Sequence, residues 1–285
     1  MRILVTGASG QIGSALVDSL KKNGSDVFGT SRSSVGANII ELNLENIPLI
    51  KKQLSQLETL DCLVLCAGVT SIKECRLNPI KSRVVNVDAQ IEVAEVALGM
   101  GCTRIVFIST DKIFDGNKPY VGADSIANPT TEYGRQKFQA EIELSKLGSA
   151  VQIVRFTKVL SARNQLLVDW ISQLQRGEAI TAFVDSVISP VSVDSAVEVI
   201  SALIAGSGNA INQFSASDEI SFYEMGCALA EIIDSPVSNV LQRKASDVGE
   251  TAITHSSLES TLFSSIEPMS SLHAVRQIVE KIISS

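Results

Sequence analysis

A glycine-rich turn at the amino terminus constrains the fold of this chain more than any other feature. Residues 6–13 read T-G-A-S-G-Q-I-G and directly follow the apolar run at residues 3–5. A buried strand, a tight turn and a helix start in this order are typical of a dinucleotide-binding βαβ unit. Gly7 permits the turn, Gly10 lets backbone N–H groups approach a phosphate, and Gly13 lets the helix pack against the strand. The helix dipole then favours a pyrophosphate at this point.

The spacing G-x-x-G-x-x-G is not the commoner G-x-G-x-x-G, so a tight turn in another kind of α/β protein is the alternative. The following sequence supports the first interpretation, because the first 160 residues alternate apolar strands with amphipathic helices. Short apolar strands between helices indicate a doubly wound, Rossmann-type α/β fold with a parallel sheet covered on both faces. We expect strands at 2–6, 26–30, 38–42, 61–67, 104–109 and 150–156, and helices at 11–22, 48–57, 80–100 and 132–147.

The alternation weakens after residue 160, which predicts a smaller mixed α/β lobe. We expect helices at 165–176, 193–204, 221–233 and 271–283, a strand at 210–214, and loops over the polar stretch 235–265. The expected division is a nucleotide-binding Rossmann domain at 1–160 with a return segment at about 184–205, and a substrate-binding lobe at 161–183 and 206–285. Ligands of such sheets bind beyond the carboxyl ends of the strands.

Composition and charge argue against several classes of protein. The 285 residues are 45% apolar and 19% charged, which predicts a sizeable core. With a net charge of −7, the chain shows no basic surface of the kind that non-specific nucleic-acid binding needs. No apolar run approaches the roughly 18–20 residues that span a bilayer, and a first strand at residue 2 leaves no room for a signal peptide. The five cysteines lack paired spacing, which argues against disulfides and a zinc site. We therefore expect a cytoplasmic protein without a metal.

Candidate catalytic residues lie on the predicted helix 132–147 and at the end of the strand before it. Tyr133 and Lys137 are spaced i, i+4, which places both side chains on one helix face. A lysine cation near a phenol lowers the pKa of the tyrosine toward the pH at which it can donate a proton to a carbonyl oxygen. Thr110 ends the strand 104–109 and could hydrogen-bond the same carbonyl. The alternatives are a solvated helix face for Tyr133 and Lys137, and a cap or turn role for Thr110.

In combination, T-G-x-x-G-x-x-G, S-T-D-x-x-F-D-G at 109–116 and Y-x-x-x-K at 133–137 resemble the extended short-chain dehydrogenase/reductases. More narrowly, the chain is similar to the dTDP-4-dehydrorhamnose reductase group. Further segments that carry the resemblance are C-A-G-V-T at 66–70, V-N-V at 85–87, K-P-Y at 118–120, I-S-P-V at 188–191 and S-F-Y-E at 221–224.

The resemblance implies a role for each matching residue. Thr110, Tyr133 and Lys137 would form the catalytic triad, with Lys137 also binding the nicotinamide ribose. Asn86 would support a proton relay, or it would have only a structural role in its helix. The implied cofactor-binding residues are Gly7, Ser9, Gly10, Gln11, Ile12, Arg32, Asn43, Leu44, Ala67, Gly68, Tyr133 and Lys137. The implied substrate residues are Thr70, Thr110 and Lys158.

The end of the second predicted strand indicates which cofactor binds. An NAD-selective site usually places an acidic residue here to bind the ribose 2′-hydroxyl. This chain has instead Arg32 between Ser31 and Ser33, which suits a 2′-phosphate. We therefore expect NADP rather than NAD. The alternative is an exposed loop arginine.

Three positions depart from the pattern of the resembled group. The group's P-Y-x-E-x-D has Gly122 in place of the glutamate. Lys158 replaces an aromatic residue in the segment that lines the sugar side of the pocket. Ala15 stands where relatives carry an acidic residue that helps hold a dimer-bridging metal, so no metal-bridged dimer is expected and a homodimer of another kind stays open.

The resemblance implies an NADPH-dependent oxidoreductase acting on the 4-keto group of a nucleotide-activated deoxysugar. One alternative is a nucleotide-sugar epimerase or dehydratase, which would need further acid/base groups, whereas only Asp111 and Lys112 flank Thr110. The other is an NADP-binding regulatory subunit of another enzyme, which the changes at Gly122 and Lys158 keep open.

Overall fold

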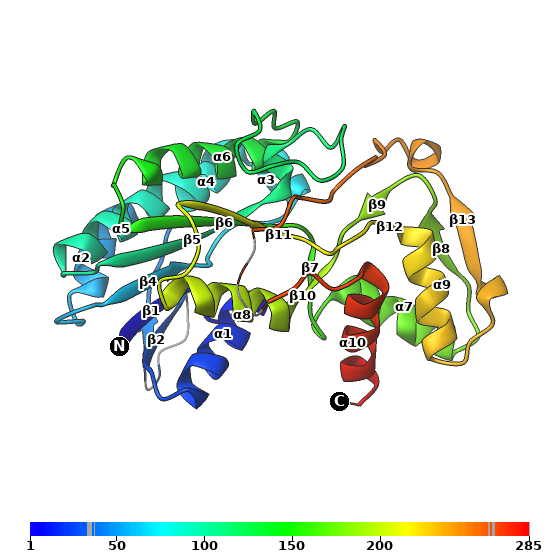
Figure 1. Cartoon of the computed structure of the whole chain (residues 1–285), viewed down its shortest axis with the longest axis horizontal. Helices are drawn as coiled ribbons and strands as arrows, with labels where there is room; N and C mark the ends of the chain where they lie inside the picture. Colours follow the sequence, from blue (N-terminus) through cyan, green and yellow to red (C-terminus); the bar gives the residue numbers. More distant parts are fainter. Residues whose placement is uncertain (33–35, 37, 262, 264–265, 285) are drawn as a thin grey trace. The chain divides into compact units, whose positions relative to one another are not determined.

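The computed structural model divides the chain into two compact units (Figure 1). It describes all residues except 33–35, 37, 262, 264–265 and 285. The first unit comprises residues 1–115, 126–155 and 197–212. The second comprises residues 116–125, 156–196 and 213–285. The predicted roles of the two parts in nucleotide and substrate binding stay predictions.

The central sheet has seven strands in the order β11-β6-β5-β4-β1-β2-β3. Its strands are β1 (Arg2–Thr6), β2 (Asp26–Ser31), β3 (Ile39–Glu41), β4 (Cys62–Leu65), β5 (Arg104–Thr110), β6 (Val151–Phe156) and β11 (Ile211–Phe214). The pairs β1–β2, β1–β4, β2–β3 and β4–β5 are parallel. Because β1 lies between β2 and β4, the strand order reverses at β1, and a crevice opens at the carboxyl ends on either side of such a reversal.

Helices cover both faces of this sheet, which confirms the predicted doubly wound α/β class. Figure 1 shows α1 on one face and α2, α5 and α6 on the other. The helices of this unit are α1 (Gln11–Lys22), α2 (Ile47–Leu54), α3 (Ile72–Leu77), α4 (Pro79–Arg83), η1 (Val84–Asp88), α5 (Ala89–Gly99), η2 (Asp111–Ile113), α6 (Glu132–Ser145) and the end of α8 (Val193–Ile204).

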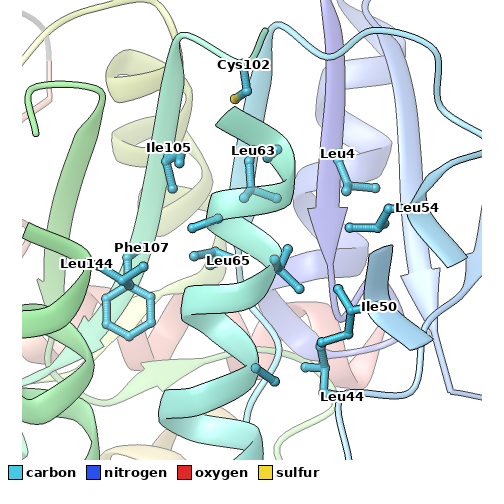
Figure 2. Packing of buried hydrophobic residues seen from close by; sticks show 14 of the residues in the cluster. Leu4, Leu44, Ile50, Leu54, Leu63, Leu65, Cys102, Ile105, Phe107 and Leu144 are labelled. Atoms are coloured by element: carbon cyan, nitrogen blue, oxygen red, sulfur yellow. The ribbon is translucent and has the colours of Figure 1, made fainter. Parts of the chain in front are cut away.

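An apolar core fixes the sheet against α2, α5 and α6. Figure 2 shows Leu63, Leu65 and Phe107 of the sheet packed beside Ile50 of α2 and Leu144 of α6. Each of these side chains is at most 1% exposed. Burial of a large aliphatic side chain contributes about 1.5–3 kcal/mol, so this layer holds the carboxyl ends of the strands in fixed positions.

The single helix predicted at 80–100 is wrong. Asn78 caps α3, Pro79 starts the short helix α4, and a π-helical turn, η1, precedes α5. A π turn inserts one extra residue per turn and is frequent at functional sites. Here it carries Asn86 inward, where the side chain is 1% exposed. Hydrophobic periodicity cannot reveal this insertion, because the apolar pattern continues through it.

The second unit has its own hydrophobic core, to which three helices contribute. Its helices are α7 (Gln165–Gln175), α9 (Phe222–Ile232) and α10 (Ser271–Ile283), with short η3 (Val237–Asn239) and η4 (Ala245–Val248). Its strands form the pairs β7–β10 (Val159–Leu160 with Val191–Ser192), β9–β12 (Val187–Ile188 with Ile220–Ser221) and β8–β13 (Ile180–Phe183 with Val240–Arg243).

The prediction of loops throughout 235–265 is wrong at β13, which pairs in parallel with β8. Only Val240 of this strand is buried, and the next three residues are exposed. A short edge strand of this kind lacks the apolar alternation by which strands are recognised in a sequence. Over the described residues, none of the helices has the length and apolar character needed to cross a bilayer.

Candidate functional site

The glycine turn between β1 and α1 brings three chain segments into close contact. Gly7 has φ +67°, a left-handed conformation that favours glycine. A Cβ on Gly7 would lie 2.9 Å from the Cα of Ala67, and a Cβ on Gly13 would lie 2.3 Å from the carbonyl oxygen of Gly7. Any larger residue at Gly7 or Gly13 would therefore push α1 or the segment after β4 out of place. The turn has the compact form that the sequence predicts.

The first turn of α1 is suited to an anion. The N-cap residue is Gly10, and no side chain hydrogen-bonds the first turn as a cap. No acidic side chain lies in that turn, while Lys21 and Lys22 lie in the last one. Helix amino termini carry unsatisfied N–H groups and partial positive charge. The predicted residues Ser9, Gly10 and Gln11 are exposed here, and Ile12 is half-buried.

Thr6 joins the end of β1 to the segment that follows β4. Its hydroxyl oxygen accepts from the backbone N–H groups of Cys66, at 3.0 Å, and Ala67, at 3.1 Å. The hydroxyl donates to the carbonyl of Val64. These bonds place Ala67 and Gly68 beside the glycine turn, as the predicted cofactor site requires. The glycine pattern does not reveal this role of Thr6, although a threonine at the end of an apolar strand is visible in the sequence.

The predicted adenosine-side residues lie at the carboxyl ends of β2 and β3. Arg32 is exposed in the bend that follows β2, and Ser33 lies outside the described residues. Asn43 is half-buried, and its side-chain oxygen accepts from the N–H of Glu45 at 3.0 Å. Leu44 is 7% exposed and belongs to the core, so its side chain supports this edge of the sheet from within (Figure 2).

Thr110 and Tyr133 meet at the carboxyl end of β5. The two side chains lie close enough for the Thr110 hydroxyl to influence the pKa of Tyr133, which it lowers. Thr110 is also the N-cap of η2, because its hydroxyl oxygen accepts from the N–H of Lys112 at 3.2 Å. The cap role and the candidate catalytic role of Thr110 are therefore compatible. The Thr110 hydroxyl donates to Asp111 Oδ1 at 3.0 Å, and Lys112 Nζ lies 2.6 Å from Asp111 Oδ2.

Lys137 is buried one helical turn after Tyr133. Its ammonium donates to the carbonyl oxygen of Ile108 at 2.5 Å and lies 3.7 Å from the ring centroid of Phe107. Burial lowers the pKa of Lys137 to about 7, against smaller opposing effects of Glu141 and Cys66. The lysine therefore titrates near neutral pH, in the range where a proton-transfer site is effective.

The expectation that Lys137 lowers the pKa of Tyr133 is wrong for the ligand-free protein. Burial raises the pKa of Tyr133 well above its usual range, and the negative charge of Asp111 adds to the effect. The hydrogen bond with Thr110 acts in the opposite direction, because a hydroxyl stabilises the phenolate. The ammonium of Lys137 is directed to Ile108 instead. Tyr133 is thus held as a neutral phenol, the form in which it can donate a proton.

Gly134 allows α6 to approach the segment after β5. A Cβ at this position would lie 2.0 Å from the carbonyl oxygen of Lys112, a distance that no side chain can occupy. The N-cap Thr131 accepts from the N–H of Gly134 at 3.1 Å and fixes the start of the helix. The contact between Thr110 and Tyr133 depends on this close approach. This role of Gly134 depends on a contact with a distant segment, so it has no signature in the local sequence.

A buried ion pair supports the base of α6 below Lys137. Arg155 Nη2 lies 2.8 Å from Glu141 Oε2, with the two side chains 5% and 3% exposed. The Ser109 hydroxyl also donates to Glu141. The ion pair connects α6 to β6, and the bond from Ser109 connects α6 to β5. The negative charge of Glu141 raises the pKa of Lys137. Arg155, Glu141 and Ser109 come from three separate elements, so spacing in the sequence gives no direct signal of this cluster.

Asn86 of η1 is fixed by several hydrogen bonds. Its side-chain oxygen accepts from the N–H of Val69 at 2.7 Å. Its amide nitrogen donates to the carbonyl of Val69 at 3.0 Å and to Gln136 Oε1 at 2.9 Å. Asn86 therefore ties η1 to α6 and to the segment after β4. These contacts fit the helix-supporting alternative of the sequence analysis.

The predicted substrate residues belong to different units. Thr70 is exposed after β4, and Thr110 is the last residue of β5, both in the first unit. Lys158 is exposed in the second unit, where its carbonyl accepts from the N–H of Val191 at 2.9 Å. The grouping of these three residues stays a prediction. Among the described residues, no three His, Cys, Asp or Glu side chains gather in a metal-binding arrangement.

Comparison with a family model identifies the relatives of the chain. The model described as RmlD substrate binding domain matches residues 1–278. The chain belongs to this family. A probable low-salt glycan biosynthesis reductase, Agl14 of Haloferax volcanii, is 28% identical to the RmlD-family chain over 282 residues, covering 92% of each protein. Methionine adenosyltransferase 2 subunit beta of Danio rerio is 25% identical over 261 residues, covering 88% of the chain and 80% of the relative.

Solved structures share the fold over nearly the whole length. dTDP-4-dehydrorhamnose reductase from Bacillus anthracis, in complex with NADP, has a TM-score of 0.87 and 21% identity, covering 98% of this chain and 99% of that one. UDP-glucose 4-epimerase from Thermotoga maritima has a TM-score of 0.86 and 20% identity, covering 100% of this chain and 99% of that one. At these identities the likeness establishes the fold, and the resemblance to the extended short-chain dehydrogenase/reductases is confirmed at the level of the family.

Proposed function

We propose that this RmlD-family protein is an NADPH-dependent reductase of the 4-keto group of a nucleotide-activated deoxysugar such as dTDP-4-dehydrorhamnose. The observation that carries the proposal is the placement of Thr110, at the carboxyl end of β5, next to Tyr133 in the first turn of α6, where the phenol is held in its neutral form. Lys137 follows one turn later on the same helix. Reduction of a carbonyl to an alcohol needs a proton donor of this kind beside the hydride path.

The first unit fits NADP at the residues expected for it. The cradle of Gly7 and Gly13, with the exposed amide groups at the start of α1, would hold the pyrophosphate. Arg32 would bind the 2′-phosphate, since a guanidinium makes paired hydrogen bonds to phosphate oxygens. Asn43, Leu44, Ala67 and Gly68 would line the space between, and Lys137 would reach the nicotinamide ribose. Bound NADPH would supply the hydride.

The residues of the chain would carry out the remaining steps. Thr110 and Tyr133 would bind the substrate carbonyl oxygen, and Tyr133 would give its proton to that oxygen as the alcohol forms. General-acid help of this kind contributes about 10²–10⁴ in rate. Lys137 would hold the ribose and supply positive charge near the phenolate that is left behind. Thr70 and Lys158 would contact the rest of the substrate.

The test is NADPH oxidation, followed by absorbance, with a panel of 4-keto nucleotide sugars. We expect turnover with at least one sugar and a loss of about 10² or more in kcat for Tyr133→Phe. Tyr223→Phe is the matched control and should retain turnover, because Tyr223 is partly buried and packs against the core of the second unit. No turnover with any sugar, together with tight NADPH binding, would contradict the proposal.

One observation favours a second candidate function. Methionine adenosyltransferase 2 subunit beta, of which the relatives from several vertebrates are 22–27% identical to this chain, is named as a subunit of another enzyme. A regulatory subunit would bind NADP without turnover and would co-purify with a partner. The same panel, combined with purification from the native source, distinguishes this function from the reductase.

A further inference from the structure

The short helices α3 and α4 carry an exposed surface that lies outside the residues assigned to cofactor and substrate. All of residues 71–83 are exposed except Cys75 and Ser82, which are 0% and 2% exposed. These two residues anchor the segment, while α3 packs against α6 and α4 against η1 (Figure 1). We call the exposed side chains of residues 71–83 the α3–α4 surface.

Three large apolar side chains are strongly exposed on the α3–α4 surface. Ile72 is 42% exposed, Leu77 is 63% exposed and Ile80 is 82% exposed. A single exposed aliphatic residue is ordinary in a folded protein. Three of them in one short segment, with charged residues between them, form the kind of patch at which a protein binds another molecule.

The same surface is basic, although the protein as a whole is acidic. It carries four cations and one carboxylate, a local net charge of +3 against −7 for the chain, contributed by Lys73, Glu74, Arg76, Lys81 and Arg83. Lys81 and Arg83 form exposed ion pairs at 3.3 and 3.4 Å. Within the part of the chain that the structure describes, Lys73 and Arg76 form no ion pair. Their charges are therefore available to a partner.

Hydrogen bonds fix this surface before any partner binds. Ser71 is the N-cap of α3, and its side chain accepts from the N–H of Glu74 at 3.1 Å. Gln136 of α6 donates to the carbonyl oxygen of Pro79 at 3.1 Å and to Ser82 Oγ at 2.9 Å. A surface that is already ordered loses little conformational freedom on association, which favours affinity.

We propose that the α3–α4 surface is the docking site for a protein partner that presents an acidic amphipathic helix. Charge complementarity selects this occupant, because an acidic helix is attracted to the cations while its apolar face covers the three aliphatic side chains. A second copy of the chain is disfavoured, since a two-fold interface would place two positive patches against each other. The docking does not depend on the proposed reductase reaction.

The test uses a fluorescently labelled synthetic peptide helix with leucines along one face and glutamates on the other. We expect the whole chain to bind it, with shifts of NMR signals centred on residues 71–83. The double variant Leu77→Glu, Ile80→Glu should weaken binding by about tenfold or more, as loss of central contacts does. Lys73→Glu combined with Arg76→Glu should weaken it as well, and added salt should weaken binding to the wild type.

Two matched controls keep the same chemical changes away from this surface. Ile126→Glu charges an apolar residue that is 93% exposed but lies outside residues 71–83. Lys22→Glu reverses an exposed cation of α1, on the other face of the sheet. Both variants should bind the peptide as the wild type does. A peptide with lysines in place of the glutamates should not bind to the wild type.

Three results with the peptides would overturn the proposal: no binding of the acidic peptide, equal binding of the basic one, or wild-type affinity in Leu77→Glu, Ile80→Glu. Self-association of the wild type through this surface, or binding to phosphatidylserine vesicles in place of the peptide, would also overturn it. NADPH oxidation is measured separately, so a protein without turnover that still binds the acidic peptide would contradict only the reductase function.

Discussion

At the scale of single residues, Lys137 is the one whose charge is most strongly opposed by its surroundings. Burial lowers its pKa from 10.5 to about 7, although Glu141 favours the charged form. Between these two values the unfolded chain binds a proton that the folded chain does not. The free energy of unfolding therefore rises with pH through this window, and below about pH 7 the folded protein bears the full cost of the buried charge.

Replacement of Lys137 by methionine should remove this pH dependence. We expect Lys137→Met to gain stability over the wild type at pH 6, by at most about 5 kcal/mol, and the gain to fade as the pH rises toward 10. The lost bond to Ile108 lowers stability by an amount that changes little with pH. Urea unfolding of the ligand-free protein at several pH values measures the difference. A pH-independent difference would show that burial does not lower the pKa of Lys137 and that the folded protein binds this proton as tightly as the unfolded chain does.

The sequence alone predicts those site residues that belong to local motifs. Tyr133 and Lys137 are found by their i, i+4 spacing and Gly7 by the glycine pattern, because short-range geometry fixes both. Glu141 and Gln136 were missed, since their importance depends on contacts with Arg155 and Asn86 from other elements. A residue whose role is set by tertiary contacts has no local signature.

At the scale of elements, the packing of α6 on η2 determines whether the site can form. Gly134 is in contact with the backbone of Lys112, where a Cβ would lie 2.0 Å from the carbonyl oxygen. We expect Gly134→Ala to destabilise the protein by about 1–3 kcal/mol, as overpacking does, and to separate Thr110 from Tyr133. Thermal unfolding and NADPH oxidation would measure the two effects.

Gly99→Ala is the control for this prediction. Gly99 lies in α5, and a Cβ there would meet no atom within 4 Å. Alanine favours a helix over glycine by up to about 1 kcal/mol, so this variant should be neutral or slightly more stable. If both variants were neutral, α6 would have room to shift, and the site would not depend on the close approach.

Elements with strong periodicity were predicted well. The bounds of α1, α8 and α10 agree with the expected helices, because each has a clear amphipathic pattern. The failures at η1 and β13 have a common cause. Tertiary hydrogen bonds set the backbone conformation in both places, through Asn86 at η1 and through pairing with β8 at β13. These contacts outweigh the local propensity of the sequence.

At the scale of the whole molecule, all of the proposed cofactor residues lie in the first unit. A ligand that binds only the folded state raises the free energy of unfolding by RT ln(1 + [L]/Kd). This increase is about 2.7 kcal/mol when the ligand concentration is a hundredfold above Kd. NADPH should therefore raise the melting temperature by about 5 °C or more, since 1 kcal/mol corresponds to about 2–4 °C for a chain of this size. The reductase and the regulatory subunit share this expectation, because both bind NADP.

The comparison of NADPH with NADH tests Arg32 in the same measurement. We expect NADPH to raise the melting temperature more than NADH at equal concentration, because only NADPH offers a 2′-phosphate to the guanidinium. Arg32→Ala should remove this difference and leave the NADH shift unchanged. Equal shifts with both cofactors in the wild type would contradict the role of Arg32, since the remaining contacts of the glycine turn are common to both dinucleotides. Once the cofactor is settled in this way, turnover with 4-keto sugars decides between a reductase and a subunit that only binds it.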